Sequence, residues 1–300
     1  MTRVAAIDCG TNSVRLLVSD GAHDVVRRME IVRLGEGVDR TGRISAGAIA
    51  RTRKVLEEYA AQVRELGAER VRMVATSATR DASNGHEFQA MVRDVLGVDP
   101  EVISGEEEAH LSFVGAVAGL PAETEPPYLV VDIGGGSTEF VLGTDDAEAA
   151  VSVDIGCVRM TERHLHSDPP TADEIAAAEA DIRAHVDQAL AAVPGRRANT
   201  LVGLAGSVTT VAGIALGLTT YDADVIHHAK IGYPDVARVT ADLLAATRTE
   251  RLAHGVMHPG RADVIGAGAL VLRTVMEQAG AGSVVASEHD ILDGVVFSLL

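Results

Sequence analysis

The feature that most constrains the fold of this chain is a short pattern that occurs twice. Each copy runs from an apolar strand through Asp-x-Gly-x-x-Ser into a second apolar strand, and the copies begin at Asp8 and Asp132. A turn between two strands that is rich in glycine and small hydroxyl residues directs several backbone N–H groups into one concavity, and such nests bind phosphate. Two copies therefore predict two similar domains that face each other across a phosphate-binding cleft.

The two loops also provide candidate ligands. An aspartate at the end of the leading strand has no apolar role there, but it can hold a divalent metal or a water molecule. The predicted phosphate cradle consists of backbone N–H groups in both loops: Thr11, Asn12 and Ser13 in the first, and Gly134, Gly135, Gly136 and Ser137 in the second.

The composition limits the class of protein. A chain of 300 residues with 47% hydrophobic and 23% charged residues is typical of a soluble globular protein with two domains. No signal peptide is visible, and no apolar stretch approaches the roughly 20 residues that span a bilayer, so we expect no membrane association. The two cysteines, Cys9 and Cys157, lack metal-ligand spacing, which predicts free thiols and a cytoplasmic location.

The charge distribution argues against one class of partner. A net charge of −17 and an aromatic content of 3% are unlike a nucleic-acid-binding protein, which usually carries a basic surface and stacking aromatic residues. Basic residues nevertheless outnumber acidic ones between Arg27 and Lys54. This segment is either an ordinary solvated surface or a guide for a polyanion, and the sequence leaves both interpretations open.

Strands and helices alternate along the chain, which predicts an α/β fold with helices covering the sheets. Three strands are expected within residues 4–34. The segment 75–84 is expected to be a loop at the carboxyl end of a strand, where α/β sheets usually bind ligands. Prolines within residues 120–127 mark a linker, so we expect an N-terminal domain at 1–124 and a C-terminal domain at 125–300.

Five motifs follow one another in the chain: I-D-C-G-T-N-S-V-R-L at 7–16, A-T-S-A-T-R-D-A-S-N at 75–84, V-I-S-G-E-E-E-A at 102–109, V-V-D-I-G-G-G-S-T-E at 130–139 and L-A-G-S-V-T-T-V-A at 204–212. Together they resemble the exopolyphosphatase and guanosine pentaphosphate phosphohydrolase family, part of the actin, sugar kinase and Hsp70 ATPase superfamily. The resemblance covers the whole chain and implies two similar ribonuclease H-like (actin-like ATPase) domains with a cleft between them. In that architecture the halves hinge about a crossing helix, so the terminal helix at 290–300 is expected to pack back on the first domain.

The resemblance also implies roles for the acidic residues of these motifs. Glu108 matches the catalytic glutamate of the family, which positions or deprotonates the attacking water, and Glu107 is the fallback. The structural alternative is that acidic residues in a first helical turn are simply favoured by the helix dipole. Asp132 is implied to hold Mg²⁺ or Mn²⁺, with Glu139 and Asp8 as further ligands.

Two further positions complete the expected site. Arg80 is expected to bind a phosphoryl oxygen bidentately, or else to pair with Asp81 at the surface. Gly206 and Ser207 resemble the position where related ATPases approach a nucleotide, and here they hold a distal phosphate or nothing.

The leading hypothesis is a metal-dependent phosphohydrolase that removes the terminal phosphate of inorganic polyphosphate. The alternatives are hydrolysis of guanosine pentaphosphate (pppGpp), a kinase or ATPase of the same superfamily, and a sensor that binds polyphosphate or an alarmone without turnover. Leu292 replaces the arginine of the Arg-Glu-Gly ending that the family usually shows, a departure that concerns the preference for long chains more than catalysis. The oligomeric state is open, and a homodimer is one of the alternatives.

Overall fold

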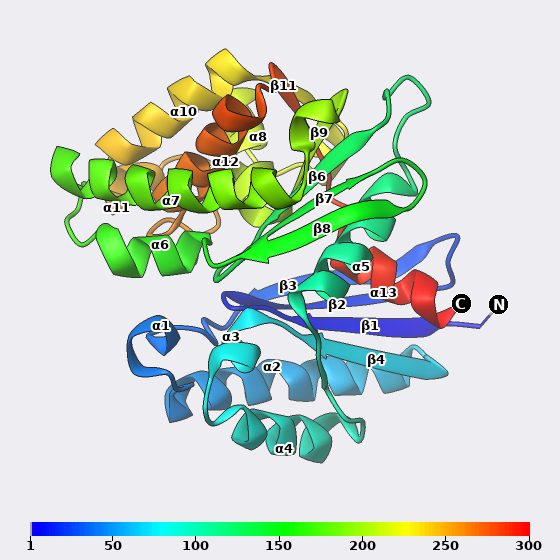
Figure 1. Cartoon of the computed structure of the whole chain (residues 1–300). Helices are drawn as coiled ribbons and strands as arrows, with labels where there is room; N and C mark the ends of the chain where they lie inside the picture. The colour runs from blue at the N-terminus through cyan, green and yellow to red at the C-terminus, as the bar shows by residue number, and fades with distance from the viewer. Residues whose placement is uncertain (1) are drawn as a thin grey trace. The chain divides into compact units, whose positions relative to one another are not determined.

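The structure, a computed structural model, describes residues 2–300 (Figure 1). It divides into two compact units. Unit 1 extends to Gly115 and also includes Ile291–Leu300, and unit 2 comprises Ala116–Asp290. The division falls in the last turn of the helix α5, Gly105–Val117, before the boundary expected at residue 124.

Unit 1 contains one mixed five-stranded sheet in the order β3-β2-β1-β4-β5. β1 pairs antiparallel with β2 and parallel with β4, and β2 pairs antiparallel with β3, so the three strands expected within residues 4–34 are present and form a meander. The strands are β1 Val4–Cys9, β2 Ser13–Ser19, β3 Asp24–Ile31, β4 Arg70–Ala75 and β5 Glu101–Val102.

Helices cover both faces of this sheet (Figure 1). One face packs on α2 and α4 through Leu56, Tyr59 and Phe88, and the other packs on α5 and α13 through Leu111 and Leu292. Besides α5, the helices of unit 1 are α1 Val38–Thr41, α2 Ala46–Glu65, α3 Ser77–Asp81, α4 Gly85–Leu96 and α13 Ile291–Leu299.

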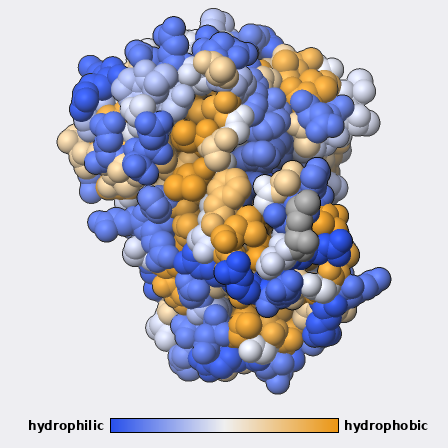
Figure 2. Space-filling view, turned by 90° about the vertical axis from the view of Figure 1, so that its right-hand side faces the viewer, coloured by the Kyte–Doolittle hydropathy of each residue, from blue (hydrophilic) through white to orange (hydrophobic). Residues whose placement is uncertain are grey.

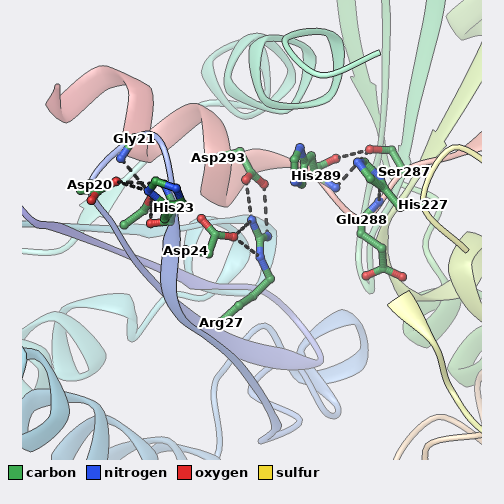
Figure 3. A network of polar contacts seen from close by, with 11 residues as sticks. Asp20, Gly21, His23, Asp24, Arg27, His227, Ser287, Glu288, His289 and Asp293 are labelled. Atoms are coloured by element: carbon green, nitrogen blue, oxygen red, sulfur yellow. Dashed lines mark hydrogen bonds and ion pairs between the residues drawn. The ribbon is translucent and has the colours of Figure 1, made fainter. Parts of the chain in front are cut away.

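The chain's last helix, α13, is fixed to unit 1 by an ion pair and by close packing. The buried carboxylate of Asp293 accepts a hydrogen bond from Arg27 of β3 at 3.2 Å, and the same guanidinium contacts Asp24 (Figure 3). Gly294 lies against the Leu111 carbonyl of α5, so that a methyl group at 294 would overlap that carbonyl. The C-terminal segment therefore contributes to the core of the N-terminal unit.

Unit 2 repeats the topology of unit 1 and adds one strand. Its sheet has the order β10-β11-β9-β6-β7-β8, in which β8-β7-β6-β9-β11 corresponds to β3-β2-β1-β4-β5, and β10 pairs antiparallel with β11 at the edge. The strands are β6 Tyr128–Ile133, β7 Thr138–Gly143, β8 Ala147–Val153, β9 Thr200–Leu204, β10 Lys230–Gly232 and β11 Ser283–Ala286.

The core of unit 2 lies between this sheet and a layer of helices, in which α7, α10 and α12 are prominent (Figure 1). α7 begins at a capping box in which the Thr171 hydroxyl accepts from the Glu174 N–H and the Glu174 carboxylate accepts from the Thr171 N–H. The helices are α6 Cys157–His164, α7 Ala172–Ala192, α8 Ala205–Ala215, α9 Ala223–Ile226, α10 Tyr233–Ala245, α11 Arg248–Arg251 and α12 Ile265–Ala279, with a 3₁₀ turn at Gly195–Arg197.

Hydrophilic residues cover most of the face shown in Figure 2. Within residues 2–300, no helix is both long enough and apolar enough to cross a membrane.

One segment differs from the expectation drawn from the sequence. Ser77–Asp81 forms the short helix α3 instead of a loop, because the Thr76 carbonyl accepts hydrogen bonds from the N–H groups of Thr79 and Arg80. Because Ser77 and Arg80 lie on one helix, their positions relative to each other are fixed.

The close packing of α13 generates a stability prediction. Replacing Gly294 by alanine should lower the free energy of unfolding by about 1–3 kcal/mol, because the new methyl group must displace the Leu111 carbonyl. The matched control in unit 1 is Gly47→Ala in α2, where a methyl group meets only the end of the Arg51 side chain at 3.7 Å. Urea unfolding should show a loss for the first variant and none for the second; equal midpoints would contradict this packing.

Candidate functional site

The first Asp-x-Gly-x-x-Ser loop is closed and clamped by its own backbone. The Gly10 N–H donates to the Ser13 carbonyl at 3.0 Å. The Thr11 carbonyl accepts from the Gly35 N–H at 2.8 Å, and the Asn12 carbonyl accepts from two N–H groups that directly follow β3. Since a trans peptide directs its C=O and N–H to opposite sides, the N–H groups of Asn12 and Ser13 point away from this clamp.

The second loop has the same construction with a different clamp. The Gly134 N–H donates to the Ser137 carbonyl at 3.0 Å, as in the first loop. The carbonyls of Gly134 and Gly135 accept from the first N–H groups of α6, and the Gly136 carbonyl accepts from the Arg159 side chain at 2.6 Å. The N–H groups of Gly135, Gly136 and Ser137 therefore point to the side opposite α6. In each loop these N–H groups point to one side, as in a nest that binds phosphate. The Gly134 N–H, which was expected in the cradle, instead donates to the Ser137 carbonyl.

Each loop carries its aspartate at the same place in the sheet. Asp8 of β1 is the cross-strand neighbour of Arg15 in β2, and Asp132 of β6 is the cross-strand neighbour of Glu139 in β7. The partners have opposite charges. Asp8 is ion-paired with Arg15 at 2.7 Å, whereas Asp132 lies beside a second carboxylate, Glu139, which accepts a hydrogen bond from the Ser152 hydroxyl at 2.7 Å.

The pair Asp132 and Glu139 fits a divalent cation. Both are buried, and two carboxylates at directly opposed positions of a sheet offer the oxygen ligands that hard divalent cations prefer. Mg²⁺ is commonly bound by one or two carboxylates while it keeps several waters, so two protein ligands suffice. Between residues 2 and 300 there is no group of three or more His, Cys, Asp or Glu side chains that could form a complete metal cage.

Helix α3 joins the first loop to the acidic segment at the start of α5. The Ser77 hydroxyl is hydrogen-bonded to the Thr11 hydroxyl at 2.8 Å. One turn later, Arg80 donates to the Glu108 carboxylate at 3.1 Å and to the Ile103 carbonyl at 3.0 Å. Helix α3, five residues long, therefore links the phosphate loop at Thr11 to the Glu108 carboxylate.

The structure distinguishes the two candidate glutamates. The Glu108 side chain is only 11% exposed and contacts Arg80. The Glu107 side chain is 45% exposed and pairs with Arg72 of β4 at 2.7 Å. Glu108 contacts Arg80, which belongs to α3, the helix that also contacts the phosphate loop through Ser77. Glu107 instead contacts Arg72.

Gly206 and Ser207 lie in the first turn of α8, which directly follows β9. Ala205 has a φ of 66°, a left-handed conformation that residues other than glycine rarely adopt, so the chain turns sharply here. The guanidinium of Arg261 fills the space in which a side chain at 206 would stand. Ser207 hydrogen-bonds to the thiol of Cys157, and burial raises the pKa of that thiol above its ordinary value.

Arg15 and Arg261 were not identified from the sequence as site residues, and Arg159 was expected only to pair across the cleft. The spacing alone indicates Arg15, because it lies two residues after Ser13 as Asp8 lies two residues before Gly10, which makes the two cross-strand neighbours in a hairpin. Arg159 and Arg261 reach their loops through tertiary contacts, which no local pattern indicates.

The basic segment between Arg27 and Lys54 is largely paired within unit 1, which favours the interpretation as an ordinary solvated surface. The ion pairs include Arg28–Glu30, Arg43–Glu87, Arg51–Glu36 and Arg53–Asp94.

The clamp on the second loop yields a prediction. Gly156 precedes α6, and a Cβ atom there would lie 2.5 Å from the carbonyl carbon and oxygen of Gly135. Gly156→Ala should therefore shift the loop and lower the free energy of unfolding by about 1–3 kcal/mol. Gly282→Ala is the control in the same unit, since nothing lies within 4 Å of its Cβ position. Urea denaturation provides the measurement. If both variants have the same free energy of unfolding as the parent chain, Gly156 does not pack against the Gly135 carbonyl as described.

The chain is similar to known proteins over its whole length. Residues 14–300 match the Ppx/GppA phosphatase family. Exopolyphosphatase 2 of Mycobacterium tuberculosis is 52% identical, with 100% of this chain and 99% of that protein aligned. The crystal structure of an exopolyphosphatase-like protein has a TM-score of 0.97 at 44% identity, and covers 99% of this chain and 98% of its own. A guanosine-5′-triphosphate,3′-diphosphate pyrophosphatase of Vibrio cholerae is 35% identical over 71% of this chain and 43% of its own length. The chain belongs to the Ppx/GppA phosphatase family.

Proposed function

We propose that this protein is an exopolyphosphatase, which hydrolyses the terminal phosphoanhydride bond of inorganic polyphosphate and releases orthophosphate. The observation that carries the proposal is the linkage through α3, in which Ser77 contacts the phosphate loop while Arg80 holds the buried carboxylate of Glu108. The exopolyphosphatase of Mycobacterium tuberculosis, which aligns over the whole chain, supports the substrate class.

Phosphoryl transfer depends mainly on positioning and on neutralisation of charge, and this inventory supplies both. In each unit, the loop N–H groups supply hydrogen-bond donors for phosphate oxygens. Arg80 contributes positive charge beside Glu108 and fixes the orientation of that carboxylate. Glu108 accepts a proton from the attacking water as its oxygen bonds to the terminal phosphorus and the bridging oxygen departs with the shortened chain.

The residues that would hold the metal are Asp132 and Glu139. A Mg²⁺ or Mn²⁺ ion bound there supplies neutralisation of the negative charge on the phosphate oxygens. Ser152, which donates to Glu139, orients that carboxylate. The site in which Asp8 is paired with Arg15 is less suited to a cation.

A second candidate substrate is pppGpp. The relative from Vibrio cholerae, a guanosine-5′-triphosphate,3′-diphosphate pyrophosphatase, aligns with 71% of this chain and favours this possibility. Both substrates end in the same phosphoanhydride, so the same residues would act on either. We propose a cytoplasmic location because Cys9 and Cys157 are free and buried.

The assignment of the base is tested by a matched pair of variants. Glu108→Gln should lower kcat for phosphate release from polyphosphate by about 10²–10⁴-fold, because the amide cannot take the proton from water. Glu107→Gln should retain activity within a few-fold, since its side chain is exposed and pairs with Arg72. Initial rates with polyphosphate, pppGpp and ATP in parallel provide the measurement. Loss of activity in the Glu107 variant with retention in the Glu108 variant would reverse the assignment.

The metal assignment predicts a change in the Mg²⁺ requirement. EDTA should abolish phosphate release from the parent chain, and Asp132→Asn should raise the half-saturating Mg²⁺ concentration more than tenfold, about 1.4 kcal/mol of lost metal binding. Asp145→Asn, in the exposed turn between β7 and β8, removes the same charge from the same unit and should leave the Mg²⁺ curve unchanged. A Mg²⁺ curve in Asp132→Asn that coincides with that of the parent chain would rule out this site.

A further inference from the structure

Three histidines of unit 2 form one cluster outside the phosphate loops. His227 and His228 directly follow the short helix α9, and His289 lies between β11 and α13. The centroid of the His227 ring is 3.6 Å from that of His228 and 4.4 Å from that of His289, so His227 contacts both other rings. None of the three takes part in the proposed hydrolysis.

The turn that carries the first two histidines is fixed to the end of β11. His228 has a φ of 65°, in the left-handed region that is uncommon for residues other than glycine. Two backbone hydrogen bonds hold this conformation. The His228 N–H donates to the Ala286 carbonyl at 2.7 Å, and the Ala286 N–H donates to the Ala229 carbonyl at 2.9 Å. A strained residue is therefore retained at the cluster by its contacts with β11.

The cluster lies where the chain enters and leaves unit 2. Unit 2 begins after Gly115 and ends at Asp290. His289 directly precedes that end of the unit. Near its beginning, Gly119 lies so close to His289 that a Cβ atom at 119 would be 3.4 Å from the His289 Nδ1 atom. The first and the last segment of unit 2 therefore meet at one imidazole ring.

The contacts of the cluster suit neutral rings. His227 Nδ1 accepts a hydrogen bond from the Glu288 N–H at 3.1 Å, which requires a lone pair on that nitrogen (Figure 3). A protonated His227 carries a hydrogen on Nδ1 and loses this bond. The His228 Nε2 atom is buried and has no hydrogen-bond partner within residues 2–300, so protonation of that ring would place a buried charge without an acceptor.

The charges near His228 act in both directions. Burial and the neighbouring His289 lower the pKa of His228 below its ordinary value, and they prevail over Glu123, which raises it. The other titratable groups on the segments that meet here are Tyr221, Asp222, Asp224, Lys230, Glu125, Glu288 and Asp290.

The direction of this shift makes the cluster sensitive to acid. Because the pKa of His228 is lower in the folded chain than the ordinary value of 6.5, the unfolded chain binds more protons between the two values. His228 therefore contributes stability that is complete above pH 6.5 and is lost as the pH falls through the lower value. A local opening that exposes the ring restores the ordinary pKa without unfolding the rest of unit 2, so acid favours such an opening.

We propose that His227, His228 and His289 form an acid-released latch. The neutral rings hold the connection between β11 and α13 on the turn after α9, and the protonated rings release it. The proposal goes beyond the proposed function and is independent of it, because it concerns the connection and not the hydrolysis.

The test is amide hydrogen exchange of the full chain at about pH 7.5 and about pH 5.5, followed by mass spectrometry and corrected for the intrinsic effect of pH on exchange. One pH unit below the ordinary pKa of histidine, protonation of one released ring favours opening by about tenfold. Peptides spanning 226–230 and 284–290 should lose protection by this factor, whereas peptides from β6 and β9 should not. A local measurement is chosen because protonation of other histidines of unit 2, such as His164 and His185, contributes to global unfolding.

Three substitutions remove the protons that the latch can bind. His228→Asn retains a residue that tolerates the left-handed backbone, and His227→Asn retains an acceptor for the Glu288 N–H. Combined with His289→Gln, they should reduce the acid response to less than about twofold. His228→Asn alone should reduce it to about threefold or less, and it replaces the triple variant in the test if that variant does not fold. His166→Gln is the matched control, since His166 is exposed in the same unit and its variant should respond like the parent chain.

Glu123→Gln tests the sign of the effect. Because Glu123 raises the pKa of His228, its removal should enlarge the loss of protection in acid. The proposal is overturned if the parent chain has equal protection at both pH values, or if the histidine variants lose as much protection as the parent chain does. A smaller acid response in Glu123→Gln than in the parent chain would overturn it as well.

Discussion

The site depends on the hydrogen bonds that hold the carbonyls of the two glycine-containing loops. In unit 1 the backbone after β3 binds the carbonyls of Thr11 and Asn12, and in unit 2 the start of α6 binds those of Gly134 and Gly135. Because each peptide is planar, fixing its carbonyl also fixes the direction of the next N–H. Most of these carbonyls are held by backbone N–H groups, and Arg159 holds that of Gly136. The charged side chains beside the loops can therefore differ between the two units.

The charge beside the loop is where the two units differ. The strand order and the hairpin register are the same in both units, whereas the cross-strand neighbour of the aspartate is Arg15 in one and Glu139 in the other. Helix α3 joins Thr11 to Glu108 through Ser77 and Arg80, and the proposal of Glu108 as the base rests on this linkage.

Much of this was predictable from sequence because it is local. The repeated Asp-x-Gly-x-x-Ser pattern predicts both hairpins, and alternation of strands and helices predicts the α/β class. Helix α3 was not predicted, since it depends on the Thr76 carbonyl being positioned by the sheet. Arg159 and Arg261 reach the loops only through tertiary contacts. Leu292, which replaces the family's arginine, lies in an apolar cluster with Leu111, so its consequence could be seen only after folding.

The central claim is that the chain removes phosphate from the ends of polyphosphate. The most direct measurement follows the ³¹P NMR spectrum of a long polyphosphate incubated with the protein and Mg²⁺. If terminal phosphates are removed one at a time, the orthophosphate signal grows and the signal of internal phosphates of the polymer falls. The signal of the polymer's end phosphates stays constant. A rising chain-end signal would mean internal cleavage, and an unchanged spectrum would mean no hydrolysis; either result would contradict the account.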